Sequence, residues 1–187
     1  MTTSDHHRWL VLVVKIPAEP SRHRVAAWRE LRRIGALSLG QGIWAVPDVP
    51  DFGDGVRRTV ELAERAGGHA IVLEATGRGE QDAARLRASF DELREADWTE
   101  FLADCGKFEE EIAKEIRIAK FTLAELEEEE QSLERLRRRH RDLTARDVFG
   151  SALAARAAER LKQCAAVCEH YAGLVFRTLH EHPEDTR

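Results

Sequence analysis

The feature that most constrains this sequence is a long stretch without helix breakers. From Glu80 to Leu179 there is no proline, and glycine occurs only at positions 106, 150 and 173. Apolar residues recur there at three- and four-residue steps, a spacing that predicts long amphipathic helices. These positions are Leu86, Phe90, Leu93, Trp98, Phe101, Cys105, Phe108, Ile112, Ile116, Leu123, Leu126, Leu133, Leu136 and Leu143.

Two local signals divide this stretch into three or four helices. Thr122, followed three residues later by Glu125, matches a capping box at the start of a helix. Gly150-Ser151 is the clearest break, with Ser151 as the expected N-cap of the last helix. Short turns between long helices favour antiparallel packing. Residues 80–181 are therefore predicted to form an antiparallel helical bundle domain.

The first part of the chain has a different pattern, in which short apolar runs alternate with glycine and proline. The run from Trp9 to Ile16 is almost entirely apolar, which is typical of a central or doubly covered strand. Further strands are expected at 36–39, 43–46 and 69–75, with helices at 22–34 and before Gly67. This order is the ferredoxin-like βαββαβ arrangement. Residues 8–76 are predicted as a ferredoxin-like domain, and the fold class as α+β.

The overall charge excludes a protein that binds nucleic acid with its whole surface. The formal net charge is −5, although charged residues make up 34% of the chain. Any binding of nucleic acid must therefore come from a local basic face.

The helix expected at 22–34 is the strongest candidate for such a face. Arg22, Arg29 and Arg33 are spaced by seven and four residues, which places them on one side of a helix. Ser21 is the expected N-cap of this helix. Guanidinium groups bind phosphate and other oxyanions bidentately, and the helix N-terminus adds positive potential. The alternative is a solvated face with ordinary ion pairs, for instance to Glu30. The predicted anion- or nucleic-acid-binding residues are Lys15, Arg22, Arg24, Arg29, Arg32 and Arg33.

Trp28, Gln41 and Trp44 are the residues expected to line a pocket beside this helix. Indole rings can stack on a flat ligand or gate its entry. The favoured interpretation of Trp28 and Trp44 is nevertheless core packing, because both occupy positions expected to face inward.

A second group of reactive side chains lies in the helical domain. Cys164 and Cys168 are one helical turn apart, a spacing that can chelate a soft metal ion. They also continue an apolar stripe, and free cysteine is often buried, so core packing is the favoured interpretation. No metal and no cofactor is predicted. The weak candidates for metal ligands are Glu125, Glu128, Cys164, Cys168 and His170.

Motifs that would identify an enzyme are missing from the sequence. It contains no Walker loop, no dinucleotide-binding glycine motif after a strand, no nucleophile elbow and no zincin motif. Their absence argues mildly against a conventional enzyme. The alternative is a metal-dependent or redox enzyme that uses carboxylates, cysteines and histidine of the helical domain.

The remaining composition predicts location and assembly. Three cysteines, odd in number and without a framework spacing, favour a reducing interior, and no segment approaches the ~20 apolar residues of a membrane span. A cytoplasmic protein with no membrane partner is expected. The acidic residues 127–130 precede the basic residues 137–141 on one predicted helix. An antiparallel second copy would match these charges, so a homodimer is predicted. The alternative interpretation of the charge pattern is two ordinary solvated helix faces.

Several segments resemble the N-terminal region of ChrB-type chromate-resistance proteins. The most specific segment spans residues 12–36, and it is followed by the motif Gly42-Ile-Trp-Ala-Val-Pro47. Residues 120–128 and the motif Asp147-Val-Phe-Gly150 fit the same pattern, so the resemblance extends from about residue 8 to residue 176.

The resemblance implies a regulator associated with chromate resistance, of a type regarded as DNA-binding sensors of the oxyanion. DNA and oxyanions such as chromate or sulfate are the partners it implies. The first module also resembles the central module of PaaX-type repressors, which is related to a CRISPR-associated endonuclease fold. Lys15 stands where those nucleases carry an aspartate, so no metal-dependent cleavage is expected. Nothing in this sequence matches the winged helix of PaaX-type repressors or the further C-terminal domain of ChrB-type chains.

Overall fold

The structure, a computed structural model, describes residues 8–181. The chain divides into two compact units, one up to Leu93 and one from Arg94 onward. Helix α3 (Glu80–Arg117) contributes its first turns to the first unit and its remainder to the second. The predicted boundary at 76–80 coincides with the start of α3.

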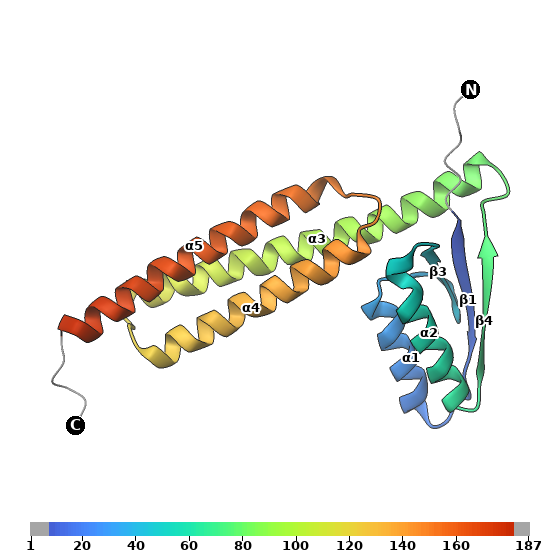
Figure 1. The fold of residues 1–187 in the computed structure, drawn as a ribbon, viewed down its shortest axis with the longest axis horizontal. Helices are drawn as coiled ribbons and strands as arrows, with labels where there is room; N and C mark the ends of the chain where they lie inside the picture. Colours follow the sequence, from blue (N-terminus) through green and yellow to red (C-terminus); the bar gives the residue numbers. More distant parts are fainter. Residues whose placement is uncertain (1–7, 182–187) are drawn as a thin grey trace. The chain divides into compact units, whose positions relative to one another are not determined.

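The first unit is a four-stranded antiparallel sheet with two helices, α1 and α2, on one face (Figure 1). The strand order is β2-β3-β1-β4, which a βαββαβ chain gives in the ferredoxin-like arrangement. The predicted α+β class and element order are confirmed. The elements are β1 (Trp9–Lys15), α1 (Ser21–Arg33), β2 (Leu37–Gly40), β3 (Ile43–Pro47), α2 (Pro50–Arg65) and β4 (His69–Ala75).

Strand β1 is central, which explains its almost continuous apolar sequence. It pairs with β3 on one side and with β4 on the other, so that Leu12 lies opposite both Trp44 and Val72. Directly opposite residues of an antiparallel pair share a face, and neighbouring residues alternate. Leu12 and Trp44 are both buried. Val11 and Val13 therefore lie on the opposite face of the sheet.

That opposite face is partly exposed. Val13 is aligned with Ile43 and Ile71, and Val11 with Leu73. Ile71 and Leu73 are about half exposed and Ile43 is 38% exposed, although all three are large and apolar.

Aromatic contacts close the core of the first unit. The ring of Phe90, in the first part of α3, lies 5.6 Å from that of Trp9 and 6.3 Å from that of Phe52, measured between centroids. All three side chains are at most 2% exposed. Edge-to-face packing of this kind adds stabilisation beyond the buried area. It explains why the first unit includes residues beyond β4.

The second unit consists of the rest of α3 with α4 (Leu123–Arg146) and α5 (Ala152–Glu181), which lie side by side (Figure 1). Its buried core includes Trp98, Phe101, Cys105, Ile112, Leu126, Leu133, Cys164, Tyr171 and Val175. These are the positions of the apolar stripe in the sequence, together with their partners on α5. The predicted bundle is thus built from three long helices.

The predicted caps of the bundle are confirmed. The Thr122 hydroxyl accepts a hydrogen bond from the Glu125 backbone N–H at 3.3 Å, which starts α4. The Ser151 hydroxyl accepts one from the Leu153 backbone N–H at 3.1 Å, at the start of α5. None of the helices within residues 8–181 combines the length and apolar content that crossing a bilayer requires.

Candidate functional site

Helix α1 carries most of the predicted binding residues, and it begins one residue earlier than expected. Ser21 is the first helical residue, and the N-cap is Pro20, which makes no side-chain hydrogen bond. The predicted N-cap role of Ser21 is therefore wrong. Proline offers no side-chain acceptor, and its ring presets the backbone for a residue at the helix start.

The outer face of α1 is basic. Helical geometry places Arg22 and Arg29 on the side away from Ala27 and Leu31, which are buried. Arg22 and Arg29 are exposed, and neither forms an ion pair with any of residues 8–181. Their guanidinium groups are therefore available to an anion from solution.

Arg33 has the same helical direction but is bound to a carboxylate. Its guanidinium donates to Glu30 at 2.6 and 2.8 Å, and Arg58 of α2 donates to the same carboxylate at 2.8 Å. Hydrogen bonds from Arg33 and Arg58 hold the pKa of the Glu30 carboxyl at about 2. For Arg33, the alternative of an ordinary ion pair to Glu30 is therefore the one observed.

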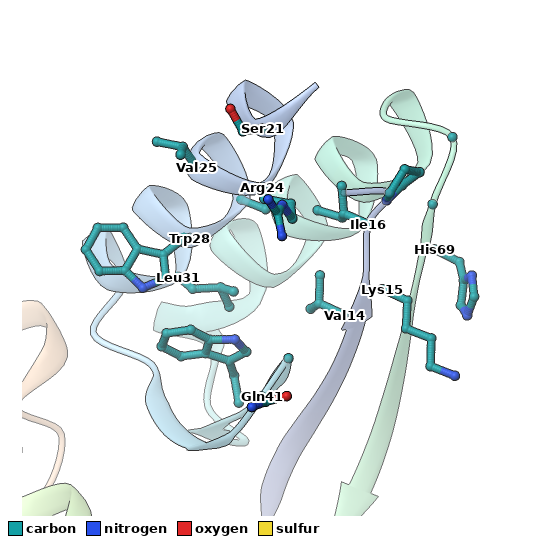
Figure 2. A pocket seen from close by; sticks show the side chains of 16 residues that line it. Val14, Lys15, Ile16, Ser21, Arg24, Val25, Trp28, Leu31, Gln41 and His69 are labelled. Carbon is teal, nitrogen blue, oxygen red and sulfur yellow. The ribbon is translucent and has the colours of Figure 1, made fainter. Parts of the chain in front are cut away.

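The inner side of α1 borders a hollow of about 810 Å³ (Figure 2). The hollow lies between α1, the end of β1, the hairpin that joins β2 to β3, and the turn before β4. Its walls are largely apolar and include Val14, Ile16, Val25 and Leu31. Cavities of this size are typical of small-molecule sites.

Five of the predicted residues line this hollow: Lys15, Arg24, Trp28, Gln41 and Trp44. Core packing is confirmed for Trp44, which is 8% exposed, and is wrong for Trp28, which is 52% exposed. Trp28 lies beside the buried stripe of α1, where its ring borders the hollow and about half of it is left uncovered by residues 8–181. The spacing of apolar residues predicted the helix α1, but it could not show which other element packs against each of its residues.

Lys15 contributes to the hollow without directing its amine into it. Lys15 is aligned with His69 at the end of the sheet. Figure 2 shows both side chains on the side of the sheet away from α1. Arg32 packs on Trp28 instead. Its guanidinium carbon lies 5.5 Å from the centre of the Trp28 ring, where it makes a cation–π contact. The structure therefore does not bring the six predicted basic residues into a single receptor.

The candidate metal ligands of the second unit also remain apart. Cys164 and Cys168 are buried in the bundle, as core packing predicts, whereas Glu128 and His170 are exposed and Glu125 is ion-paired with a lysine. Within residues 8–181 there is no group of three or more His, Cys, Asp or Glu side chains that could hold a metal ion. The neighbouring Cys105 thiol and burial raise the pKa of Cys164, so its unreactive thiol form dominates at neutral pH.

Comparison with known proteins shows which family the chain belongs to. A sequence model of the N-terminal region of Protein ChrB matches residues 24–182, which is most of the chain. The chain belongs to the ChrB N-terminal family. The resemblance to ChrB-type chromate-resistance proteins is thereby confirmed. The matched region contains Arg24, Trp28, Gln41 and Trp44, and it begins after Lys15 and Arg22.

A ChrB relative shows how much of such a protein this chain represents. Protein ChrB of Cupriavidus metallidurans strain CH34 is 29% identical over 140 residues. The match covers 75% of this chain and 39% of that relative. This ChrB-family chain therefore spans well under half the length of the relative.

Proposed function

We propose that this ChrB-family chain is a regulatory protein of chromate resistance that binds DNA or an oxyanion through the outer face of α1. The observation that carries the proposal is the pair Arg22 and Arg29. Both are exposed on one helical face, and among residues 8–181 neither has a carboxylate partner.

The chemistry of this face suits phosphate-like groups. Arginine donates bidentately to phosphate and stays charged at any physiological pH. At a rise of 1.5 Å per residue, Arg22 and Arg29 are about 10 Å apart along the helix axis. Such a spacing favours two phosphates of a nucleic acid backbone over one small ion. A local basic face also reconciles nucleic-acid binding with a net charge of −5.

The test is the affinity for the DNA upstream of the chain's own operon, measured by fluorescence anisotropy. The double variant R22A/R29A should bind about tenfold or more weakly at 0.1 M salt, with a salt slope shallower by about 2. The matched control is R57A/R65A on α2, which removes two exposed arginines that are paired with Asp54 and Glu61. Equal losses in the two double variants would refute the role of the outer face.

Oxyanion response is tested in the same assay. Chromate at increasing concentration should change the DNA affinity, and sulfate should compete because it is also a tetrahedral dianion. If neither ion has an effect while DNA still binds, the protein binds DNA without sensing the oxyanion. If DNA does not bind, isothermal titration calorimetry with chromate decides whether the sensing part of the proposal remains, and absence of chromate binding there would refute that part as well.

A further inference from the structure

We propose that the hollow beside α1 binds an organic anion with a flat apolar body, in the class of aromatic carboxylates and sulfonates. Arg24 holds the charged group, and the body lies against Trp28 and Trp44. This inference goes beyond the proposed function, because it concerns the other side of α1 and requires no DNA.

The hollow has the size and the lining of a site for such a molecule. Its volume of about 810 Å³ lies within the ordinary range of small-molecule pockets. Val14, Ile16, Val25 and Leu31 supply an apolar wall. An aromatic body placed against this wall gains the free energy of removing apolar surface from water.

Arg24 is the cationic group of the hollow. Figure 2 shows its side chain directed into the space between α1 and Ile16. It forms no hydrogen bond or ion pair with any part of the chain that the structure describes. Arg57, Arg58 and Arg65 of the same unit all pair with carboxylates. Glu19 borders a second, smaller hollow of about 640 Å³ that Arg24 also lines, but no ion pair joins the two residues.

Trp28 provides the stacking surface. Tryptophan is the largest side chain, and 52% of Trp28 remains exposed at the edge of the hollow. The guanidinium of Arg32 makes a cation–π contact with the Trp28 ring, and its central carbon is 5.5 Å from the ring centre. A flat ligand would cover apolar area that no part of residues 8–181 covers, and Trp44 borders the same space from β3.

The same features argue against an inorganic dianion in the hollow. A small tetrahedral ion needs several donors around it, because removing its charge from water is costly. The Lys15 amine and the His69 ring point away from α1. The polar side chains that remain are those of Arg24, Ser21 and Gln41. Arg24 beside an apolar wall therefore suits a ligand that carries one negative charge on an apolar body.

The test uses two dyes that share an apolar body. The dye 8-anilino-1-naphthalenesulfonate carries one negative charge, and N-phenyl-1-naphthylamine carries none. We expect the charged dye to bind with 1:1 stoichiometry and to quench the tryptophan fluorescence of the protein by energy transfer. R24Q should weaken its binding by about tenfold or more, as loss of a charge-assisted hydrogen bond does, and should change the uncharged dye's binding less than twofold.

Two control variants make the result specific. R29Q removes the same charge from the outer face of α1 and should leave the affinity for the charged dye within twofold. I71S/L73S disrupts the exposed apolar area on the opposite face of the sheet and should also leave it unchanged. W28A should weaken both dyes. All these positions are exposed, and circular dichroism would verify that each variant is folded.

Three results would overturn the proposal. Equal effects of R24Q and R29Q would mean that the dye responds to general charge. Loss of binding in I71S/L73S but not in W28A would place the dye on the sheet. Absence of saturable binding would show that the hollow holds no such anion. DNA affinity measured on the same variants separates this outcome from failure of the proposed function, because the proposed DNA contacts lie on Arg22 and Arg29.

Discussion

Asp147 shows how much of the bundle depends on a single side chain. Its carboxylate accepts hydrogen bonds from the Trp98 indole at 2.8 Å, from the Gly150 backbone at 3.1 Å and from the Ser151 backbone at 2.9 Å. These bonds fix the turn between α4 and α5 and attach it to α3. Ionised acceptors make stronger hydrogen bonds than neutral ones, so this residue stabilises the turn strongly.

We predict that D147A destabilises the second unit by about 2–4 kcal/mol, because three donors lose a charged acceptor. D147N keeps one acceptor oxygen and should lose less. Urea unfolding monitored by circular dichroism measures both effects. D142A is the matched control, since Asp142 is exposed in the last turns of α4, for which Asp147 is the C-cap, and has no partner among residues 8–181. A loss in D142A as large as that in D147A would contradict this role.

Trp28 and Trp44 illustrate a different limit at the residue scale. Both tryptophans border the same hollow, yet one is 52% exposed and the other 8%. Trp44 lies on a strand whose face is covered by helices, whereas Trp28 lies at the edge of a helix. Both are tryptophans at positions that the apolar pattern of their own element predicts to face inward. The elements packed around each position therefore decide which ring is buried.

At the scale of elements, α1 is attached to α2 through Glu30. The side chain of Glu30 is only 12% exposed, and it receives guanidinium groups from both helices. The folded state therefore favours the charged carboxylate, whose pKa is about 2 instead of the ordinary value near 4.3. The two arginines are half exposed, which reduces the contribution of these ion pairs to stability.

We predict that E30Q destabilises the first unit by about 1 kcal/mol at pH 7, after allowance for solvent screening. Since the folded pKa is lowered, this stabilisation is present above the unfolded pKa and is lost as the pH falls from about 4.3 toward 2. Wild type and E30Q should therefore converge in stability as the pH falls toward 2. Urea unfolding across this range measures the difference, and E61Q, at a single exposed ion pair, is the control. A difference that is independent of pH would argue against the carboxylate pairing.

At the scale of the whole molecule, the charges exposed on α4 suggest how two copies of the chain could associate. Its first half exposes Glu127, Glu128 and Glu130, and its second half exposes Arg137 and Arg138. A second copy placed antiparallel would bring opposite charges together along the helix. We therefore predict that two copies of the chain associate as a homodimer and that they do so through this surface.

Sedimentation at micromolar concentration should then show a dimer that weakens as salt rises from 0.05 to 0.5 M, because exposed charges are screened. R137E/R138E should dissociate it at low salt, and adding E127R/E128R should restore it by reversing both halves. The control R156E/R177E makes the same charge change at exposed positions of α5. If the dimer is unaffected by salt and by R137E/R138E, the interface lies elsewhere on the molecule.

The sequence alone determined the secondary structure and its order. Helix periodicity, glycine and proline positions and the cap at Thr122 are local properties, and each acts within a few residues of its own position. For that reason the βαββαβ order, the helical character of the second part and the buried cysteines follow from the chain itself, whereas the sequence left open whether that part forms three helices or four. The basic character of α1 is equally local.

Only the tertiary structure decided what the basic residues do. Arg22, Arg24 and Arg33 belong to one helix, yet one is exposed to solvent, one lines a hollow and one binds Glu30 beside α2. The difference arises from contacts between elements that are distant in the sequence. A hollow bounded by β1, α1, the β2–β3 hairpin and the turn before β4 exists only when the sheet has brought those segments together. No local pattern encodes its volume or its lining.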